Sequence, residues 1–254
     1  MPGIAGITGP KATQQQINTM LSKLRHRGPD DQWSVANGDL AFGTCMSNLG
    51  KEKGLAYAEC DGITVLFDGE IYNERPEGAA DVEVALDMYR KHGRTFASQL
   101  QGVFACAITD GNDVVLARDA VGVRPLYWGR DETGSICFAS ELKALTGIVS
   151  EVHDLPPASV YSSKTGLQPY LPSYPEVEVP DSVDEARDML RELLVRATDR
   201  RLADGRVGGV LLSGGLDSSI IAAIAHEINP RLPAFTVAMT VSYTHLTLPT
   251  ILLV

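Results

Sequence analysis

The sequence lacks several features that would each indicate a particular class of protein. Lysine and arginine (22 residues) are outnumbered by aspartate and glutamate (32 residues), and the net charge of −10 argues against nucleic acid or an anionic membrane as a partner. No apolar run approaches the length that spans a bilayer. Residues 1–6 show no basic region followed by an apolar core, so no secretory signal is predicted. We therefore expect a cytoplasmic protein.

Cysteine is also scarce. Its four positions have neither CxxC spacing nor the density of a disulfide framework, and they are Cys45, Cys60, Cys106 and Cys137. A reduced compartment without structural zinc is the simplest interpretation.

What the sequence does contain is typical of a globular protein, with 44% hydrophobic and 21% charged residues over 254 positions. Up to residue 172, short strand-like runs alternate with turn signals, and helical spacing occurs at 13–24 and 81–89. The strand-like runs are 4–7, 40–42, 63–67, 104–109, 114–117 and 136–139. We expect a β-rich first domain over 1–172. The proline-rich stretch 155–181 should break regular structure, and its end, 173–181, is the predicted linker.

Beyond the linker, helices and strands alternate. Ser182 and Glu185 form a capping-box pattern, with Glu185 expected to reach back to the N-cap of a helix that carries an apolar stripe. The apolar run 207–212 predicts a buried strand, 220–228 a helix and 233–239 a second strand. This alternation predicts a parallel α/β sheet that binds ligands at the carboxyl ends of its strands.

The most informative stretch is 213–219, Ser-Gly-Gly-Leu-Asp-Ser-Ser, which lies between the first of these strands and the helix. Backbone N–H groups and the positive end of a helix meet there, and that combination suits an anion. The glycines let the backbone approach a pyrophosphate, and the serines offer hydroxyl donors. A carboxylate at Asp217 makes sense facing phosphates mainly if Mg²⁺ lies between them. The alternative is an ordinary serine- and glycine-rich turn.

Five further motifs precede this loop in order, and they are Arg-His-Arg-Gly-Pro-Asp (25–30), Gly-Glu-Ile-Tyr-Asn (69–73), Gln-Gly-Val-Phe-Ala (101–105), Arg-Asp-Ala-Val-Gly-Val-Arg-Pro-Leu-Tyr (118–127) and Ala-Ser-Glu-Leu-Lys-Ala-Leu (139–145). Together with the loop, they resemble glutamine-dependent asparagine synthetase and its relatives over roughly residues 1–239. The resemblance implies an N-terminal-nucleophile hydrolase-like αββα sandwich in 1–172, a glutaminase-type domain. It also implies that 182–240 is the start of an α/β ATP-pyrophosphatase domain.

The chemistry implied by this resemblance is ATP-dependent amide formation. The aspartate side chain would be adenylated, and ammonia would displace AMP to give asparagine. ATP and Mg²⁺ are the implied cofactors, aspartate and ammonia or glutamine the other small-molecule partners, and a homodimer is kept as an open expectation. The implied ATP-binding residues are Leu211, Ser213, Gly214, Gly215, Leu216, Asp217, Ser218, Ser219 and Val237, with Asp217 as the Mg²⁺ ligand. Leu211 and Val237 would hold the adenosine from the ends of their strands, or are plain strand core.

The sequence departs from the family at the glutaminase end. The resemblance implies a cysteine nucleophile directly after Met1, where this chain has Pro2. It implies an asparagine that donates to the oxyanion, where this chain has Asp68, whose charge would repel the oxyanion. An arginine expected within 43–46 to clamp the glutamine carboxylate is missing. Cys45 is no substitute nucleophile, since it lies far along the chain.

Some glutamine-binding positions are retained, namely Gly69, Glu70 and Asp81. The resemblance implies that Asp81 pairs with the substrate amino group, although Glu70 and Asp81 can equally be exposed carboxylates of a turn and a helix cap. The connection 73–81 is shorter than is usual in the family. We predict impaired glutamine hydrolysis, with ammonia as the nitrogen donor.

Two alternatives stay open. One is a relative of β-lactam synthetase, in which the glutaminase domain is degenerate and an internal amine closes a ring. The other is a non-catalytic scaffold, against which Asp217 argues. The segment 241–254 resembles translated adapter read-through and is expected not to be native. We expect the chain as written to be inactive, with the apolar face of its sheet exposed.

Overall fold

The computed structural model describes residues 2–47, 56–170, 179–203, 205 and 207–237. The chain divides into two compact units, Met1–Val177 and Glu178–Val254, and each is described here by itself. Most of the predicted linker 173–181 and all of the segment 241–254 lie outside the described residues. No helix within the described ranges is long and apolar enough to cross a bilayer.

The first unit is built on two six-stranded antiparallel sheets. In spatial order, the first sheet contains β10 (Val152–Asp154), β8 (Tyr127–Arg130), β9 (Ile136–Ala139), β1 (Gly3–Thr8), β3 (Leu40–Met46) and β2 (Asp31–Asn37). The second contains β12 (Gly166–Pro169), β11 (Ser159–Ser162), β7 (Val114–Arg118), β6 (Gly102–Thr109), β5 (Ile63–Ile71) and β4 (Tyr57–Cys60). The helices are α1 (Gln14–Leu24), η1 (Arg25–Arg27), α2 (Asp81–His92), η2 (Gly93–Gln99) and α3 (Leu142–Leu145).

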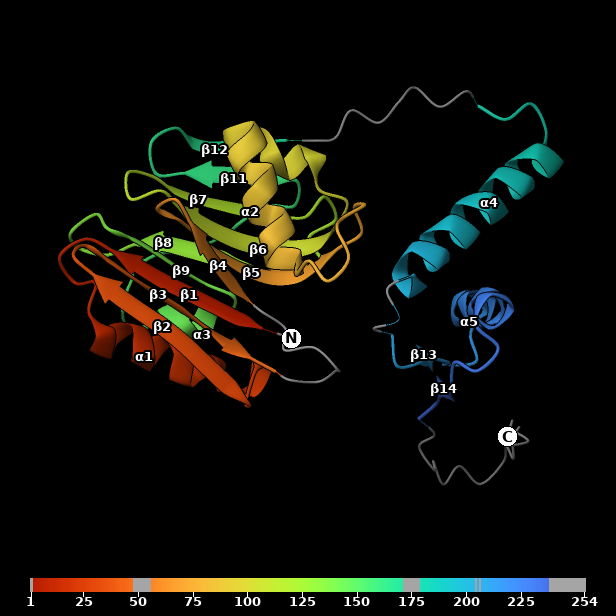
Figure 1. Cartoon of the computed structure of the whole chain (residues 1–254), viewed down its shortest axis with the longest axis horizontal. Coiled ribbons are helices and arrows are strands. Elements are labelled where there is room, and N and C mark those ends of the chain that lie inside the picture. Colours follow the sequence, from red (N-terminus) through yellow and green to blue (C-terminus); the bar gives the residue numbers. More distant parts are fainter. Residues whose placement is uncertain (1, 48–55, 171–178, 204, 206, 238–254) are drawn as a thin grey trace. The chain divides into compact units, whose positions relative to one another are not determined.

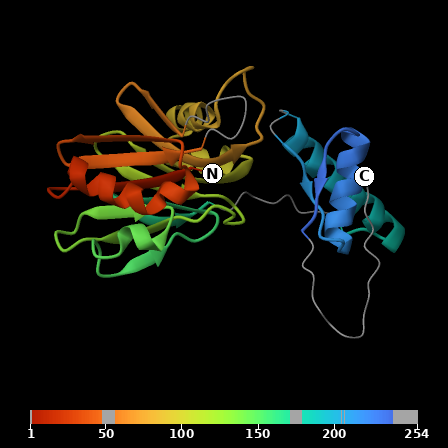
Figure 2. The same cartoon turned by 90° about the horizontal axis from the view of Figure 1, so that it is seen from below.

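These elements form four layers. α1 begins after Thr13, whose hydroxyl caps it, and its buried side chains Ile17, Met20, Leu21 and Leu24 pack against the first sheet together with α3. α2 and η2 cover the second sheet, and a third apolar cluster fills the space between the sheets. Figure 1 shows α1 and α2 on opposite outer faces, and in Figure 2, seen from below, α1 lies in front of the sheets. The predicted αββα sandwich is confirmed.

Sequence reasoning missed several strands of this sandwich. The edge or near-edge strands β2, β4, β8 and β10 carry few fully buried side chains and therefore show no clear alternation. The hairpin β11–β12 lies inside the stretch where prolines were expected to prevent regular structure. Pro169 is tolerated because β12 is an edge strand, where a missing N–H breaks no second ladder.

Strand alternation determines which side chains of β5 and β1 face the space between the two sheets. On β5, Leu66 and Asp68 point between the sheets, while Phe67 and Ile71 point towards α2. Ile4 on β1 faces the same inter-sheet space from the other sheet. The start of β1 and the second half of β5 thus face the same inter-sheet layer.

The second unit contains α4 (Val183–Leu202), β13 (Val210–Leu211), α5 (Leu216–Ile228) and β14 (Ala234–Phe235). β13 and β14 pair in parallel, with Val210 opposite Ala234, as expected for the start of an α/β sheet. Ser182 caps α4 by accepting from the N–H of Glu185 at 3.1 Å.

Two predictions about this unit are wrong in detail. Glu185 does reach back, but its Oε2 accepts from the N–H of Asp181 at 2.9 Å instead of that of the N-cap residue. The strand predicted as buried over 207–212 is short, and its Leu211 side chain is 78% exposed. Within the described residues only β14 pairs with β13, so nothing covers that side chain. Leu216 and Phe235 are exposed as well, which is the apolar exposure that the sequence predicts.

Candidate functional site

Arg27 connects the start of β1 to the buried Asp68. Its Nε donates to the backbone oxygen of Pro2 at 2.9 Å, and its Nη2 donates to Asp68 Oδ2 at 2.5 Å. The two side chains of this ion pair are 8% and 0% exposed. η1 can bring Arg27 there because Gly28 follows, where a Cβ would lie 2.4 Å from the backbone of Cys45. The position expected for the nucleophile is therefore fixed through its backbone, with no thiol at Pro2.

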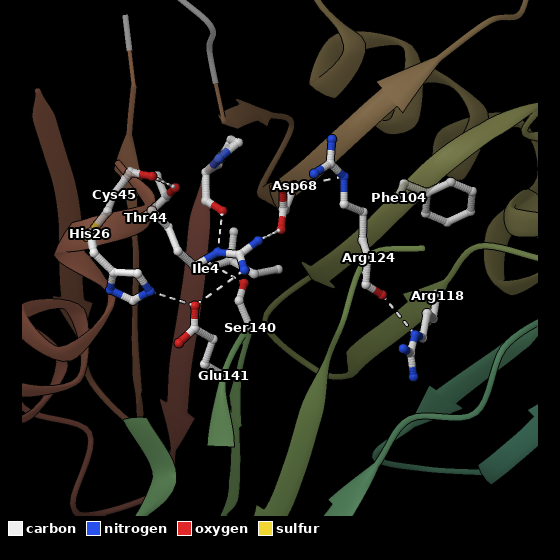
Figure 3. Close-up of polar contacts among 12 residues, drawn as sticks. Ile4, His26, Thr44, Cys45, Asp68, Phe104, Arg118, Arg124, Ser140 and Glu141 are labelled. Carbon is white, nitrogen blue, oxygen red and sulfur yellow. Dashed lines mark hydrogen bonds and ion pairs between the residues drawn. The ribbon is translucent and has the colours of Figure 1, made fainter. Parts of the chain in front are cut away.

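Arg124 approaches Asp68 from the other side, with its Nε 3.9 Å from Asp68 Oδ1. Figure 3 shows Arg124 and Asp68 facing each other. Burial raises the pKa of the Asp68 carboxyl, and the two guanidinium groups act in the opposite direction. As a carboxylate it accepts hydrogen bonds, and so it does not supply the N–H donor that an oxyanion site needs.

The loop after β7, which carries Arg124, is held by a set of hydrogen bonds. The buried carboxylate of Asp119 accepts from five backbone N–H groups, those of Phe104, Val121, Gly122, Val123 and Arg124. Arg118 donates to the carbonyl oxygens of Arg124 at 2.8 Å and Gly122 at 3.0 Å. The motif 118–127 thus contains a hydrogen-bonded loop that ends at the start of β8.

Glu141 extends the charged cluster towards the surface. Its Oε1 lies 2.8 Å from His26 Nε2 and 3.4 Å from Arg27 Nη1, and its Oε2 lies 3.0 Å from Lys143 Nζ. Burial alone would raise the pKa of Glu141, but hydrogen bonds from Lys143 and His26 outweigh it and lower the pKa. The neighbouring Ser140 accepts from the N–H of Ile4 at 2.9 Å, which ties this cluster to β1 (Figure 3).

Cys45 is much closer to the N-terminus than sequence distance suggests. β3 pairs with β1 so that Cys45 lies directly opposite Gly3. Its side chain nevertheless points to the α1 face, where Sγ donates to the carbonyl of Leu21 at 3.3 Å. Burial raises its pKa to about 11, which disfavours the nucleophilic thiolate. The prediction that chain separation excludes Cys45 is therefore wrong, because the direction of its side chain on β3 is what keeps this thiol out of the site.

The positions predicted to bind glutamine differ in their surroundings. Gly69 has φ +155°, and a Cβ there would lie 2.1 Å from the carbonyl oxygen of Val103, so the position requires glycine. Glu70 is exposed and accepts from the hydroxyl of Tyr72 at 3.2 Å.

Asp81 is buried, so the alternative of an exposed carboxylate does not apply to it. Its Oδ1 accepts from the N–H of Ile71 at 2.9 Å and from Arg75 Nη1 at 2.5 Å. A guanidinium group thus occupies the place at which a substrate amino group was expected.

Sequence reasoning gave no role to Arg27, Arg124, Glu141 or Arg75, although these side chains define the polar end of the sandwich. The first three lie in motifs that carry the resemblance, so a charged side chain without an assigned role in each motif is the signal that could have identified them. Arg75 lies in none of them, and only the shortness of its loop pointed to it.

The loop 213–219 lies in the second unit. Gly214 has φ +82°, and Gly215 is the N-cap of α5 without a side-chain cap. The hydroxyls of Ser213 and Ser218 lie 2.9 Å apart, and that of Ser219 donates to the carbonyl of Gly215 at 2.7 Å. The loop is exposed, and the first turn of α5 has N–H groups that no helical carbonyl can satisfy. This geometry suits an anion.

Other positions predicted for the nucleotide are brought to the same region. Asp217 and Leu216 lie in the first turn of α5. Leu211 ends β13 and Val237 follows β14, and these residues are 78% and 90% exposed in this chain. The described residues contain no group of three or more His, Cys, Asp or Glu side chains able to hold a metal.

Comparison with known proteins agrees with the fold and the motifs. The glutamine phosphoribosylpyrophosphate amidotransferase of B. subtilis, solved with ADP and GMP, superposes with a TM-score of 0.56 at 19% identity, covering 98% of this chain and 69% of that one. The family model for the glutamine amidotransferase domain matches residues 1–169. The first unit is thus a glutamine amidotransferase domain with an N-terminal-nucleophile fold.

The family model for asparagine synthase matches residues 189–245. "Asparagine synthetase [glutamine-hydrolyzing] 2" of Arabidopsis thaliana is 35% identical over 254 residues, and a probable asparagine synthetase of Schizosaccharomyces pombe is 38% identical over 236. These alignments cover 89% and 84% of this chain and 42% of each relative. The chain belongs to the glutamine-hydrolysing asparagine synthetase family, and it spans less than half the length of these relatives.

Proposed function

We propose that the protein serves ATP-dependent amide formation, with aspartate as the carboxylate substrate and asparagine as the product. A carboxylate does not react with ammonia at neutral pH until one oxygen becomes a good leaving group. In the first step, an oxygen of the aspartate side chain bonds to the α-phosphorus of ATP, and pyrophosphate leaves. In the second, the nitrogen of ammonia attacks the acyl carbon, the bond to AMP breaks, and a proton is released.

The observation that carries this proposal is the geometry of the loop 213–219. Its glycines and the start of α5 present N–H groups where pyrophosphate charge would develop, and the hydroxyls of Ser213 and Ser218 lie beside them. Asp217 would hold Mg²⁺, which neutralises phosphate charge when bound. Leu211 and Val237 offer exposed apolar surface at one end of the parallel strand pair, where a nucleoside could pack.

The proposed nitrogen donor is ammonia, with glutamine hydrolysis impaired. Pro2 offers no thiol at the nucleophile position, and the nearby thiol of Cys45 faces α1. Asp68 offers a buried carboxylate where an amide donor would be needed, and Arg27 is committed to it.

The test is product analysis of a full-length form of the protein with ATP, Mg²⁺ and aspartate, using ammonium or glutamine as the nitrogen source. We expect asparagine, AMP and pyrophosphate with ammonium, and little product with glutamine. ADP and phosphate as products would contradict the adenylation, and equal rates with both sources would contradict the donor. Failure to bind Mg·ATP in calorimetry would favour a scaffold role for the chain.

The departures at Pro2 and Asp68 also favour a second candidate, in which an internal amine of the substrate replaces ammonia, as in β-lactam synthetase. That reaction releases the same AMP and pyrophosphate but needs no ammonium. Pyrophosphate release that depends on an amine-bearing carboxylic acid and is independent of ammonium would select it.

A further inference from the structure

The loop between β5 and α2 carries an ion pair that bears on which molecules the first unit can bind. Arg75 Nη1 lies 2.5 Å from Asp81 Oδ1, and the two side chains are only 18% and 10% exposed. The same oxygen accepts from the N–H of Ile71 at the end of β5. Asp81 is therefore held from the strand and from the loop at once.

The loop is short and anchored at both ends, so Arg75 has little freedom to leave. At its start, the Oδ1 of Asn73 accepts from the N–H of Gln101 at 2.7 Å. At its end, the N–H of Ala80 donates to Glu83 Oε2 at 2.8 Å in the first turn of α2. The seven-residue connection between Asn73 and Asp81 thus holds the guanidinium beside the carboxylate.

A free amino acid that used Asp81 would place its ammonium group where this guanidinium lies. Two cations at one carboxylate oxygen repel each other, and this repulsion is stronger where the oxygen is buried. The guanidinium also has the advantage of being tethered, because a short linker gives it an effective concentration of roughly millimolar or more. An external ammonium group must therefore displace an internal competitor.

We propose that Arg75 is an internal substitute for the amino group of a free amino acid and closes the Asp81 site to glutamine. The inference rests on the proposed function, in which glutamine hydrolysis is impaired, and deepens it by giving Asp81 the role that the family resemblance implies. Glutamine is excluded at the binding step by Arg75, in addition to the missing thiol at Pro2. Arg75 is a specificity-determining residue and takes no part in chemistry.

The experiment measures equilibrium binding of L-glutamine by calorimetry to the whole chain, without ATP. The unaltered chain should show no binding at about 10 mM glutamine, roughly ten times the upper end of ordinary KM values. Arg75→Ala and Arg75→Met should bind glutamine with a dissociation constant at least about tenfold below this concentration. Arg75→Lys keeps a cation beside Asp81, so this variant should not bind glutamine. Its comparison with Arg75→Met separates the effect of charge from that of side-chain size.

Two controls make the result specific. Arg90→Ala removes an exposed arginine–aspartate pair with Asp61, 2.7 Å long, far along α2, and should gain no glutamine binding. Arg75→Ala combined with Asp81→Asn should lose the binding that Arg75→Ala alone gains, because the carboxylate is the expected partner. Circular dichroism of each variant reports whether it is folded.

Glutamine binding by the unaltered chain would overturn the inference whatever the variants do, and so would a folded Arg75→Ala variant that gains no binding. Neither result depends on amide formation. Loss of the ATP-dependent reaction would overturn the proposed function while leaving the glutamine titrations unaffected, so the two failures are distinguishable.

Discussion

Arg27 Nη2 and Asp68 Oδ2 lie 2.5 Å apart at the end of the sandwich, and neither side chain has appreciable contact with water. Removing one partner of such a pair leaves the other as an uncompensated buried charge, which costs more than the pair itself contributes. The buried guanidinium of Arg27, which comes from η1, needs an opposite charge, and the Asp68 carboxylate on β5 supplies it. The replacement of the expected asparagine by Asp68 is therefore part of how this domain is held together.

We expect Arg27→Ala to lower the free energy of unfolding of the first unit by about 3–5 kcal/mol. Both tryptophans, Trp33 and Trp128, lie in this unit, so tryptophan fluorescence during urea unfolding reports on it selectively. Lys91→Ala removes an exposed pair with Asp87 on α2 and should change stability by no more than about 0.5 kcal/mol. Equal effects of the two substitutions would show that the Arg27 pair is not buried in solution.

Glu141 gives a pH-dependent prediction. Its pKa is lower in the folded chain than in the unfolded chain, so the unfolded chain binds the proton first as the pH falls. Its ionised form stabilises the fold above the ordinary glutamate pKa of about 4.3, and this contribution is lost as the pH falls below that value. The difference in urea midpoint between the protein and Glu141→Gln should shrink as the pH falls from about 5 towards 4. A difference that grows over this range would contradict this sign.

Gly69→Ala should destabilise the first unit by more than a backbone effect alone. A residue with a Cβ must leave φ +155° or collide with the carbonyl of Val103, so β5 and β6 must separate locally. Gly78 is the matched control, because it has φ +79° but open space around it, and Gly78→Ala should cost about 1–2 kcal/mol. Thermal unfolding of both variants measures the difference. A similar loss for both would contradict the close approach.

Asp119→Ala should release the loop that holds Arg124, since five N–H groups lose their common acceptor. Hydrogen exchange of the peptide spanning 119–126 should accelerate by at least about tenfold, because local opening then needs less free energy. Asp110→Ala is the control, as Asp110 accepts only from the N–H groups of Asn112 and Asp113 in an exposed turn. Unchanged exchange at 119–126 would exclude Asp119 as the organiser of this loop.

In a full-length form of the protein, Asp217→Asn should weaken Mg·ATP binding by about tenfold while leaving metal-free ATP binding nearly unchanged, because the carboxylate acts on the nucleotide through the ion. Calorimetric titrations with and without Mg²⁺ measure both affinities. Asp199→Asn, on α4, is a control with the same change in charge. Equal weakening of both titrations by Asp217→Asn would indicate that the side chain shapes the loop and does not hold a metal.

The fold of the first unit could be predicted because its motifs and its helical spacing agree. The stripe of Ile17, Met20, Leu21 and Leu24 fixes α1, and the buried runs of β5, β6 and β9 have clear strand patterns. The edge strands could not be predicted in the same way, because their burial depends on which neighbours the chain topology supplies. The exposure of Leu211 has the same origin, since a strand is buried only where other elements cover it.

The positions of the candidate site could be predicted from the sequence, but the side chains that pair with them could not. Pro2, Asp68 and Asp81 stand out as departures or remnants in the sequence itself. The ion-pair partners of the two carboxylates, Arg27 for Asp68 and Arg75 for Asp81, could not be assigned, because a salt bridge depends on side-chain direction and on strand register. Cys45 shows the same limit, being adjacent to Gly3 in space but turned to the other face of its strand.

The bond from Arg27 to the carbonyl oxygen of Pro2 has a consequence for how such a domain can change over time. A carbonyl oxygen is the same in every residue, so the anchor does not distinguish proline from cysteine, serine or alanine at that position. Exchange of the residue would remove or restore a nucleophile while the anchor stays in place. If position 2 holds the nucleophile, as we propose, the loss of catalysis and the loss of the fold are uncoupled there, and a single substitution can abolish glutamine hydrolysis without unfolding the domain.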